Sequence, residues 1–158
     1  MDVDPACAMA NGDLPAPETA AALLTVFDSP MAGHLRHFAT DLGWRVSVAD
    51  PAGGAVDLSR VDADTDVVVT DHDRPELGEV LRDVLDTPAR WIGVIGGVRH
   101  TAPHVAALAA LGVPEEQISR VHRPVGLNIG AHSPAEIAIA VLAGLIAHRN
   151  GRPGGFQF

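Results

Sequence analysis

The feature that most restricts the fold of this chain is a regular alternation of short apolar runs with longer segments of helical periodicity. Continuous apolar runs are typical of parallel strands that are buried on both faces of a sheet. Strands that alternate with helices favour crossover connections between parallel strands. The pattern therefore predicts an α/β fold: a single Rossmann-like doubly wound parallel sheet with helices on both faces. Strands are predicted at residues 22–27, 44–50, 66–70, 90–96 and 120–125.

The segments between these runs predict helices, of which the last is the most clearly delimited. Ser133 is suited to cap this helix, Pro134 to occupy its first position, and Glu136 to complete a capping box. The full set of predicted helices covers residues 30–42, 74–86, 100–112, 114–119 and 133–149.

The two ends of the chain lack such periodicity. Residues 1–18 hold Pro, Gly, Asp and Asn without an apolar period, which predicts a flexible N-terminal arm. Residues 151–158 are rich in turn-forming residues and predict a C-terminal tail. One Rossmann domain is therefore expected over residues 19–150, because 158 residues of 47% hydrophobic composition suit a single core.

The composition excludes several kinds of chemistry. The chain has no Lys and no Tyr, which removes Schiff-base catalysis, a P-loop lysine and a Tyr-Lys catalytic pair. The single cysteine, Cys7, excludes an intrachain disulfide and a cysteine-clustered metal site.

The charge of the chain restricts its partners and its location. A net charge of −9 argues against nucleic acid and anionic membranes as partners. No apolar run approaches the roughly 18 residues of a membrane span. The acidic N-terminus lacks the basic region of a signal peptide, so we expect a cytoplasmic protein.

The residues that follow each predicted strand are candidate site residues, because ligands bind at the carboxyl ends of the strands in such sheets. The first turn, Asp28-Ser29-Pro30-Met31, has no glycine, and a carboxylate at Asp28 repels phosphate. We expect a capped helix start here rather than a cradle for a pyrophosphate.

Polar residues follow the second and third strands. Asp50 lies where an acid in dinucleotide-binding folds accepts from the ribose hydroxyls, although Asp before Pro also serves turns. In the segment Thr70-Asp71-His72-Asp73, His72 and Asp73 are candidates to contact a metal, a transferred proton or a polar cofactor. A capped turn with exposed charges is the alternative.

Glycines and basic residues follow the fourth and fifth strands. Gly96 and Gly97 allow the backbone to approach a ligand, and Arg99 supplies anion-binding capacity at a helix start. Gly126 and Asn128 precede the capped last helix, in a segment expected either to pack on the sheet edge or to line the crevice.

The order of three segments resembles a known family. TDHD at 70–73, WIGVIGGVRH at 91–100, and PVGLNIG before an AEIA helix within 111–152 are similar to the C-terminal Rossmann domain of the xanthine dehydrogenase accessory (XdhC/CoxI) family. The resemblance covers residues 23–152 and is specific from Trp91 onward. It implies a maturation factor that binds molybdenum cofactor and helps to load it into molybdenum hydroxylase apo-enzyme.

The matches that carry this resemblance are uneven. Gly96 and Arg99 match the family's I-G-S-R-R-K segment, and Gly126 matches its P-I-G-L-D-I-G segment, in which Asn128 replaces an Asp. The glycine turn that the family often carries is replaced by residues 28–31. The family's separate N-terminal domain, with its cysteine motif, has no counterpart here, which leaves a separate N-terminal XdhC-type chain as a candidate partner.

Three functions remain open. The favoured one is a non-catalytic accessory module for molybdenum hydroxylases, which binds molybdenum cofactor or a nucleotide together with the apo-enzyme. An NAD(P)-binding oxidoreductase is less favoured, because the first turn lacks glycine and the chain lacks Tyr and Lys. The third is an interaction subunit with a vacant crevice, and a homo-oligomer is expected of a small Rossmann domain. The candidate cofactor-binding residues are Asp50, His72, Asp73, Gly96, Gly97, Arg99, Gly126 and Asn128.

Overall fold

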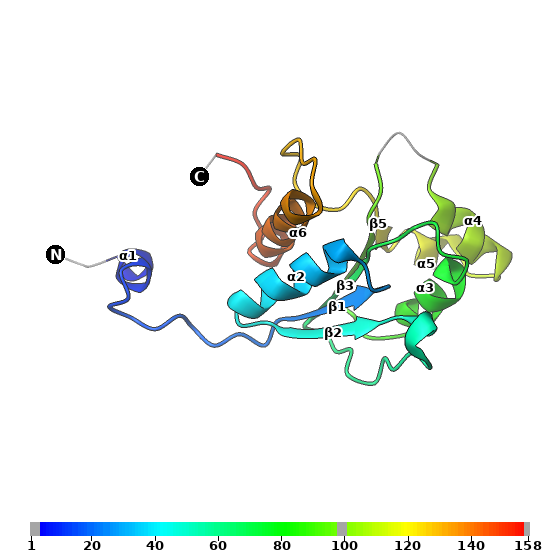
Figure 1. The fold of residues 1–158 in the computed structure, drawn as a ribbon, viewed down its shortest axis with the longest axis horizontal. Helices are drawn as coiled ribbons and strands as arrows, with labels where there is room; N and C mark the ends of the chain where they lie inside the picture. The colour runs from blue at the N-terminus through cyan, green and yellow to red at the C-terminus, as the bar shows by residue number, and fades with distance from the viewer. Residues whose placement is uncertain (1–3, 98–100, 157–158) are drawn as a thin grey trace.

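The computed structural model describes residues 4–97 and 101–156. Its centre is a five-stranded sheet in which each strand runs parallel to its neighbours, in the order β2-β1-β3-β4-β5 (Figure 1). The predicted α/β fold with one doubly wound parallel sheet is confirmed. The strands are β1 (Ala22–Val26), β2 (Arg45–Ala49), β3 (Thr65–Val69), β4 (Trp91–Val94) and β5 (Val121–His122).

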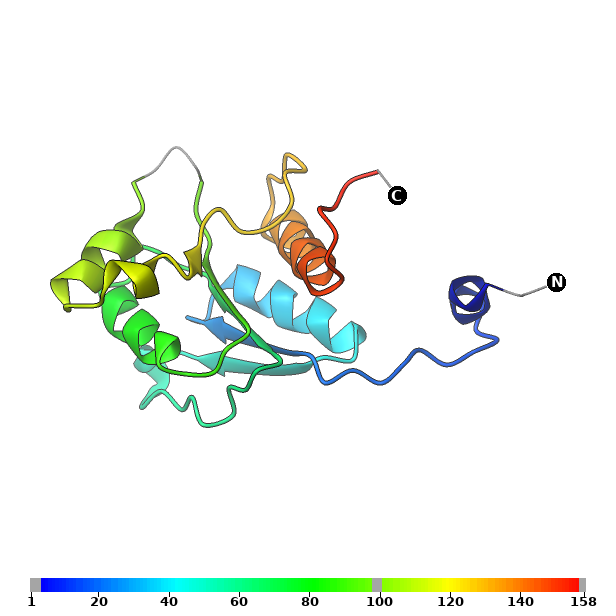
Figure 2. The same cartoon turned by 180° about the vertical axis from the view of Figure 1, so that it is seen from behind.

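Helices cover both faces of this sheet. Figures 1 and 2 show α2 and α6 side by side on one face, with α3, α4 and α5 on the other. The helices are α1 (Pro5–Ala10), α2 (Pro30–Asp41), α3 (Leu77–Leu85), α4 (Pro103–Ala110), α5 (Glu115–Ile118) and α6 (Pro134–Arg149), and a short 3-10 helix, η1 (Pro51–Gly53), follows β2.

The central strands β1 and β3 are buried along their whole length because each face has its own apolar layer. Leu23 and Val68 belong to the core beneath α2 and α6. Leu24 and Val67, their neighbours along the strands, belong to the core beneath α3 and α4. The side chains on both faces of these strands are therefore apolar, which explains the uninterrupted apolar runs of the sequence.

The direction of the strand order reverses at β1. The chain passes from β1 to β2 on one side and then crosses to β3 on the other side. Open α/β sheets bind ligands outside the carboxyl ends of the strands at such a switch point. The carboxyl ends of β1 and β3 lead into Phe27 and Thr70, so the candidate site is built around these two turns.

Two of the differences from the predicted bounds have a local cause in proline. The helix predicted at 74–86 begins at Leu77, because Arg74 precedes Pro75 and a residue before proline is sterically disfavoured in the helical region. The strand predicted at 120–125 is limited to Val121 and His122. The chain leaves the sheet before Pro124, which has no N–H to donate to a ladder.

The predicted N-terminal arm contains a short helix. Pro5–Ala10 forms α1, with Asp4 as its cap, and Figures 1 and 2 show it apart from the helices that cover the sheet. The division into arm, Rossmann domain and tail stays a prediction. Within residues 4–97 and 101–156, no helix has the length and apolar character needed to cross a membrane.

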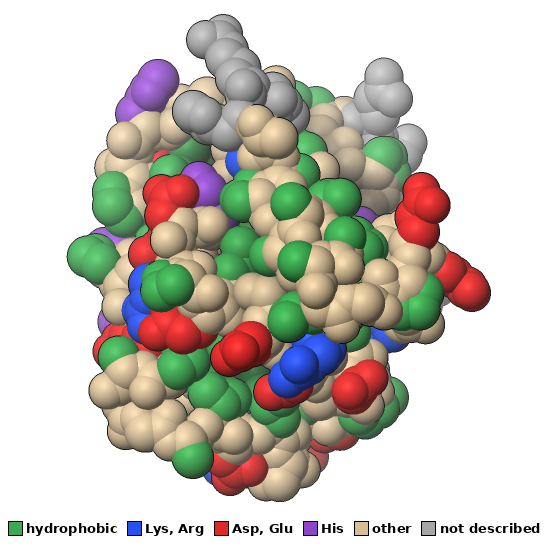
Figure 3. Space-filling view, turned by 90° about the vertical axis from the view of Figure 1, so that its right-hand side faces the viewer, with side chains coloured by type: hydrophobic (Ala, Val, Ile, Leu, Met, Phe, Trp, Pro, Cys, Tyr) green, Lys and Arg blue, Asp and Glu red, His purple; other side chains and the backbone are tan. Residues whose placement is uncertain are grey.

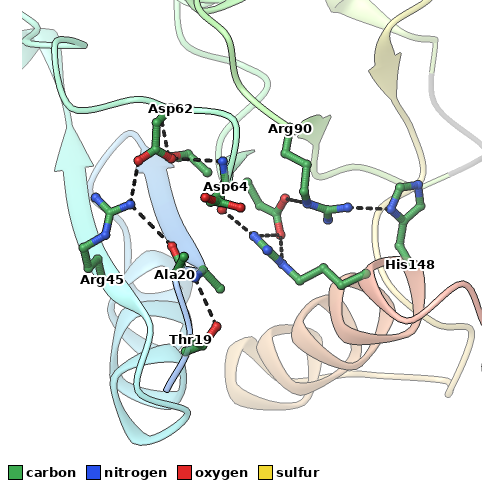
Figure 4. A network of polar contacts seen from close by, with 11 residues as sticks. Thr19, Ala20, Arg45, Asp62, Asp64, Arg90 and His148 are labelled. Carbon is green, nitrogen blue, oxygen red and sulfur yellow. Dashed lines mark hydrogen bonds and ion pairs between the residues drawn. The ribbon is translucent and has the colours of Figure 1, made fainter. Parts of the chain in front are cut away.

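A buried carboxylate ties three elements together at the amino ends of the strands. Asp66 on β3 has no exposed surface, and its oxygens accept from Nε of Arg90 at 2.7 Å and Nε of Arg149 at 3.0 Å. Arg90 precedes β4 and Arg149 ends α6. Figure 4 shows this network, in which Arg149 also donates to the Asp64 carbonyl and Arg90 contacts His148.

Replacing Asp66 should therefore destabilise the whole domain. Asp66→Asn removes the negative charge between two guanidinium groups, and breaking a buried pair of this kind costs about 3–5 kcal/mol. Urea unfolding of the variant gives this value. Asp64→Asn is the matched control, since that side chain is exposed and Arg149 uses the Asp64 backbone carbonyl. Equal losses in the two variants would show that the ion pairs do not carry the effect.

Candidate functional site

The turn after β1 is closed by the protein's own polar groups. The Ser29 hydroxyl caps α2 by accepting from the backbone N–H of Ala32 at 3.1 Å, and Pro30 has no N–H. The backbone N–H of Asp28 donates to Asp50 Oδ2 at 2.9 Å. These donors are the ones that a phosphate would use at a helix start. The predicted capped turn is confirmed.

Thr70 joins the carboxyl ends of β1 and β3. Its buried hydroxyl lies 3.0 Å from the carbonyl of Phe27 and 3.1 Å from that of Val26, and it is also bonded to the Ser29 hydroxyl. Phe27 has a φ of 68°, which is unusual for a residue with a side chain. The bonds to Thr70 hold this strained residue in place, so the first turn is rigid.

Asp50 is the centre of an ion-pair network at this edge. Its Oδ1 accepts from Arg74 Nη2 at 3.0 Å, and the backbone N–H groups of Asp28 and Ala52 also donate to the carboxylate. These bonds, that from Arg74 first, lower the pKa of Asp50 to about 2. The Arg74 guanidinium also lies 4.5 Å from the centre of the Phe27 ring. Asp50 is therefore ionised at neutral pH, with its oxygens already bonded.

A hollow of about 510 Å³ opens beside Asp50, between the end of β2 and the loop that follows η1. Its lining includes three carboxylates, from Asp28, Asp50 and Asp57, and the apolar side chains of Val48 and Val56. Asp28 pairs with Arg36 at 2.9 Å and Asp50 pairs with Arg74 at 3.0 Å, so two of these three carboxylates already have a cationic partner.

His72 and Asp73 follow β3 as predicted. His72 Nδ1 lies 2.9 Å from the carbonyl of Ile95, a contact in which the ring N–H must donate. The other ring nitrogen, Nε2, lies 3.7 Å from a carboxylate oxygen of Asp73. The Asp73 side chain is 87% exposed. The contact with Ile95 therefore fixes the orientation of the His72 ring, and Asp73 offers a carboxylate with little restraint.

Arg123 occupies the space above Gly96. A Cβ on Gly96 would lie 2.5 Å from Nη2 of Arg123, so the absent side chain makes room for this guanidinium. Arg123 donates to the carbonyls of Gly97 at 3.2 Å and Thr101 at 2.7 Å, and it bridges the two ends of the loop from β4 to α4. Arg99, the candidate anion-binding residue, lies outside the described residues.

Gly126 packs against α6. Its φ is 93°, and a Cβ there would lie 2.9 Å from the backbone nitrogen of Val141. Asn128, two residues further on, is exposed. Gly126 therefore packs on α6, whereas packing on the sheet edge or lining of the crevice was expected for this segment.

The structure thus places Asp50, His72, Gly96 and Gly97 along the carboxyl edge of β2, β3 and β4. Figure 3 looks onto this side of the molecule and shows acidic side chains spread over it, with fewer basic ones. A ligand bound here meets a face of predominantly negative charge, in keeping with the net charge of −9.

Sequence reasoning missed the two cations that organise this edge, Arg74 and Arg123. One bonds Asp50, and the other bridges the loop after Gly97. Each stands directly before a proline and close to a strand end, which is the signal that could have identified them. The proline sets the backbone of the preceding residue in an extended form, so the arginine side chain can reach across to a neighbouring strand end.

The match to a protein family agrees with this architecture. Residues 23–145 match the model of the XdhC Rossmann domain. The chain belongs to this family. The resemblance to the XdhC/CoxI proteins, which rested on three sequence segments, is therefore confirmed.

Two known proteins are similar to this XdhC Rossmann domain over part of their length. The uncharacterized protein YqeB of Escherichia coli (strain K12) is 36% identical over 109 residues, which are 69% of this chain and 20% of YqeB. A crystal structure described as a xanthine dehydrogenase from Bacillus halodurans has a TM-score of 0.66 and 25% identity, over 84% of this chain and 45% of that one. The chain thus spans a fifth of one and less than half of the other.

The bonds to Asp50 predict a loss of stability in acid. The pKa of Asp50 in the folded chain is about 2, below the ordinary aspartate value of 3.8, so the unfolded chain binds more protons between these values. The contribution of Asp50 to stability is complete above the higher value and is lost as the pH falls through the lower one. Asp50→Asn should remove this part of the pH dependence, measured by urea unfolding across that range.

The exposed Asp86 provides the control for this experiment. Its side chain forms no ion pair among the described residues, so Asp86→Asn should leave the acid dependence of stability unchanged. An acid dependence that persists undiminished in Asp50→Asn would show that the Arg74 and Asp28 contacts do not stabilise the ionised carboxylate.

Proposed function

We propose that this XdhC Rossmann domain is an accessory module in the maturation of molybdenum hydroxylases of the xanthine or carbon monoxide dehydrogenase type. It binds molybdenum cofactor, or a nucleotide, at the carboxyl edge of its sheet and presents it to the apo-enzyme. The observation that carries the proposal is the family match over residues 23–145, supported by the three segments that resemble the XdhC/CoxI proteins.

The donor set at the carboxyl edge fits the pterin part of such a cofactor. A pterin ring presents N–H donors, and the exposed Asp73 carboxylate at this edge is an acceptor for them, with the ring of His72 beside it. The phosphate of the cofactor is better placed toward Gly97 and Arg123, away from Asp28 and Asp50. The Nε of Arg123 is buried and has no hydrogen-bond partner among the described residues, which favours an acceptor group of the cofactor at this position.

When bound, the cofactor supplies the molybdenum–dithiolene chemistry that the target hydroxylase uses. The residues of this chain would hold and orient it. The ring of His72 and the carboxylate of Asp73 would bond the pterin, and Gly97 and Arg123 would form the wall after β4. Gly126 and Asn128 stay candidate contacts on the segment that leads into α6, as does Arg99.

An NAD(P)-binding oxidoreductase is the second candidate. The hollow beside Asp50 favours it, because the acid after the second strand of a dinucleotide fold binds ribose there. The engaged turn after β1 disfavours it, because the Asp28 N–H and the α2 N-terminus are already bonded. A pterin is therefore expected to bind at His72 and Asp73, after β3, whereas the ribose of NAD(P) would bind at Asp50, after β2.

The partners proposed are the hydroxylase apo-enzyme, a separate N-terminal XdhC-type chain, and a second copy of this chain. The outer edge of the sheet supports an assembly. Val46 and Val48 on β2 are 37% and 47% exposed, which is high for apolar residues on a strand.

Ligand-dependent thermal stability tests the proposal. Molybdenum cofactor, its dinucleotide form, NAD and NADP are each compared with buffer. A ligand at 100 times its Kd adds about 2.7 kcal/mol to the free energy of unfolding. We expect a shift with the molybdenum cofactor forms and none with NAD or NADP. A shift with NAD or NADP alone would support the oxidoreductase, and no shift with any ligand would overturn the cofactor site.

Substitution of His72 locates the site. His72→Ala removes one hydrogen bond to the ligand and should weaken binding of the cofactor by about tenfold, which corresponds to about 1.4 kcal/mol. His37→Ala is the matched control, because its side chain is 71% exposed on α2. Equal binding by the two variants would exclude His72 from the site.

A further inference from the structure

A second polar hollow lies at the amino ends of β4 and β5, at the edge of the sheet opposite the crevice. It has a volume of about 150 Å³. It lies beside the first residues of β4 and beside Arg120 and His122, which flank Val121 in the sequence. Its lining consists of Ala89, Arg90, Trp91, Ile92, Arg120 and His122.

Arg90 is held rigidly in this wall. Its Nε donates to the fully buried Asp66 at 2.7 Å, and its Nη1 lies 2.9 Å from Nδ1 of His148 (Figure 4). Its Nη2 is buried and has no hydrogen-bond partner among the described residues. A buried donor without an acceptor costs about 1–3 kcal/mol, so an acceptor that reaches this nitrogen would stabilise the site.

Arg120 contributes a second guanidinium to the same hollow. Its Nη1 donates to the carbonyl of Leu85 at 3.2 Å and to Oε1 of Gln117 at 2.7 Å, both uncharged acceptors. Arg120 forms no ion pair among the described residues, whereas Arg90 shares the Asp66 carboxylate with Arg149. Positive charge therefore exceeds negative charge here, in a chain whose net charge is −9.

The remaining wall is aromatic. The rings of Trp91 and His122 stack at an interplanar angle of 4°, with their centres 5.0 Å apart. Gly93 lies under the Trp91 ring, where a Cβ would collide with it. Burial and the neighbouring His148 lower the pKa of His122, so at neutral pH its ring is uncharged and the arginines supply the positive charge.

We propose that this hollow binds a phosphate-type dianion between the guanidinium groups of Arg90 and Arg120, beside the stacked rings of Trp91 and His122. Two guanidinium groups in one small hollow repel each other, and a dianion between them removes that repulsion. Guanidinium groups bond tetrahedral oxyanions through paired N–H donors. A carboxylate carries one negative charge instead of two, so it leaves part of the positive charge of the two guanidinium groups uncompensated. This site is separate from the carboxyl edge and does not rest on the proposed function.

Trp91 itself reports on the site. The chain has two tryptophans, so Trp44→Phe leaves Trp91 as the single indole fluorophore. Inorganic phosphate is titrated into this variant at constant ionic strength. Sodium chloride serves as the control for ionic strength, and sodium acetate tests whether a carboxylate binds. We expect a saturable change in Trp91 emission with phosphate and a much weaker response to acetate. Calorimetric titration of phosphate into the unsubstituted chain repeats the measurement without the Trp44 substitution.

The decisive comparison uses two arginine variants. Arg120→Gln should weaken phosphate binding by about tenfold or more, because a charge-assisted pair is lost. Arg82→Gln should bind phosphate unchanged, since Arg82 pairs with Asp83 on the exposed side of α3. Three outcomes would overturn the proposal: a response without saturation, an equal effect of both variants, or tighter binding of acetate than of phosphate.

Discussion

The burial of β1 and β3 on both faces is the constraint on which the rest of the structure depends. Two buried strands in parallel require a helix layer on each side, and this requirement fixes the crossing of the chain at β1. The crossing then brings the turn at Phe27 and the turn at Thr70 next to each other. Because Thr70 bonds the Phe27 carbonyl, the geometry of the candidate site is a direct consequence of how these strands are covered.

Arginine connects the elements at both edges of the sheet. Arg74 and Arg123 organise the carboxyl edge, whereas Arg90 and Arg149 organise the amino edge around Asp66. A planar guanidinium donates to two groups at once, and each of these side chains bridges segments far apart in the sequence. The chain has no Lys, so every basic link in the molecule has this bridging capacity.

The first turn has no glycine, and its Asp28 and Ala32 N–H groups are bonded within the protein. The family match assigns the fold to the XdhC Rossmann domains, and the turn shows which part of the crevice is occupied by protein groups. The proposed cofactor site therefore lies toward the ends of β3 and β4, where His72 and Gly97 lie. The opposite edge carries the Arg90–Arg120 hollow, so the two edges differ in charge and suit different ligands.

The sequence by itself determined the strands, the doubly wound class, the Ser29 and Ser133 caps and the family, because these depend on local periodicity and on motifs within short segments. Tertiary structure alone decided what Asp50, Gly96 and Asp66 contact. Asp50 meets Arg74 across 24 residues, and Asp66 meets Arg149 across 83 residues. Such pairs depend on strand order and helix placement, which the spacing of residues along the chain does not encode.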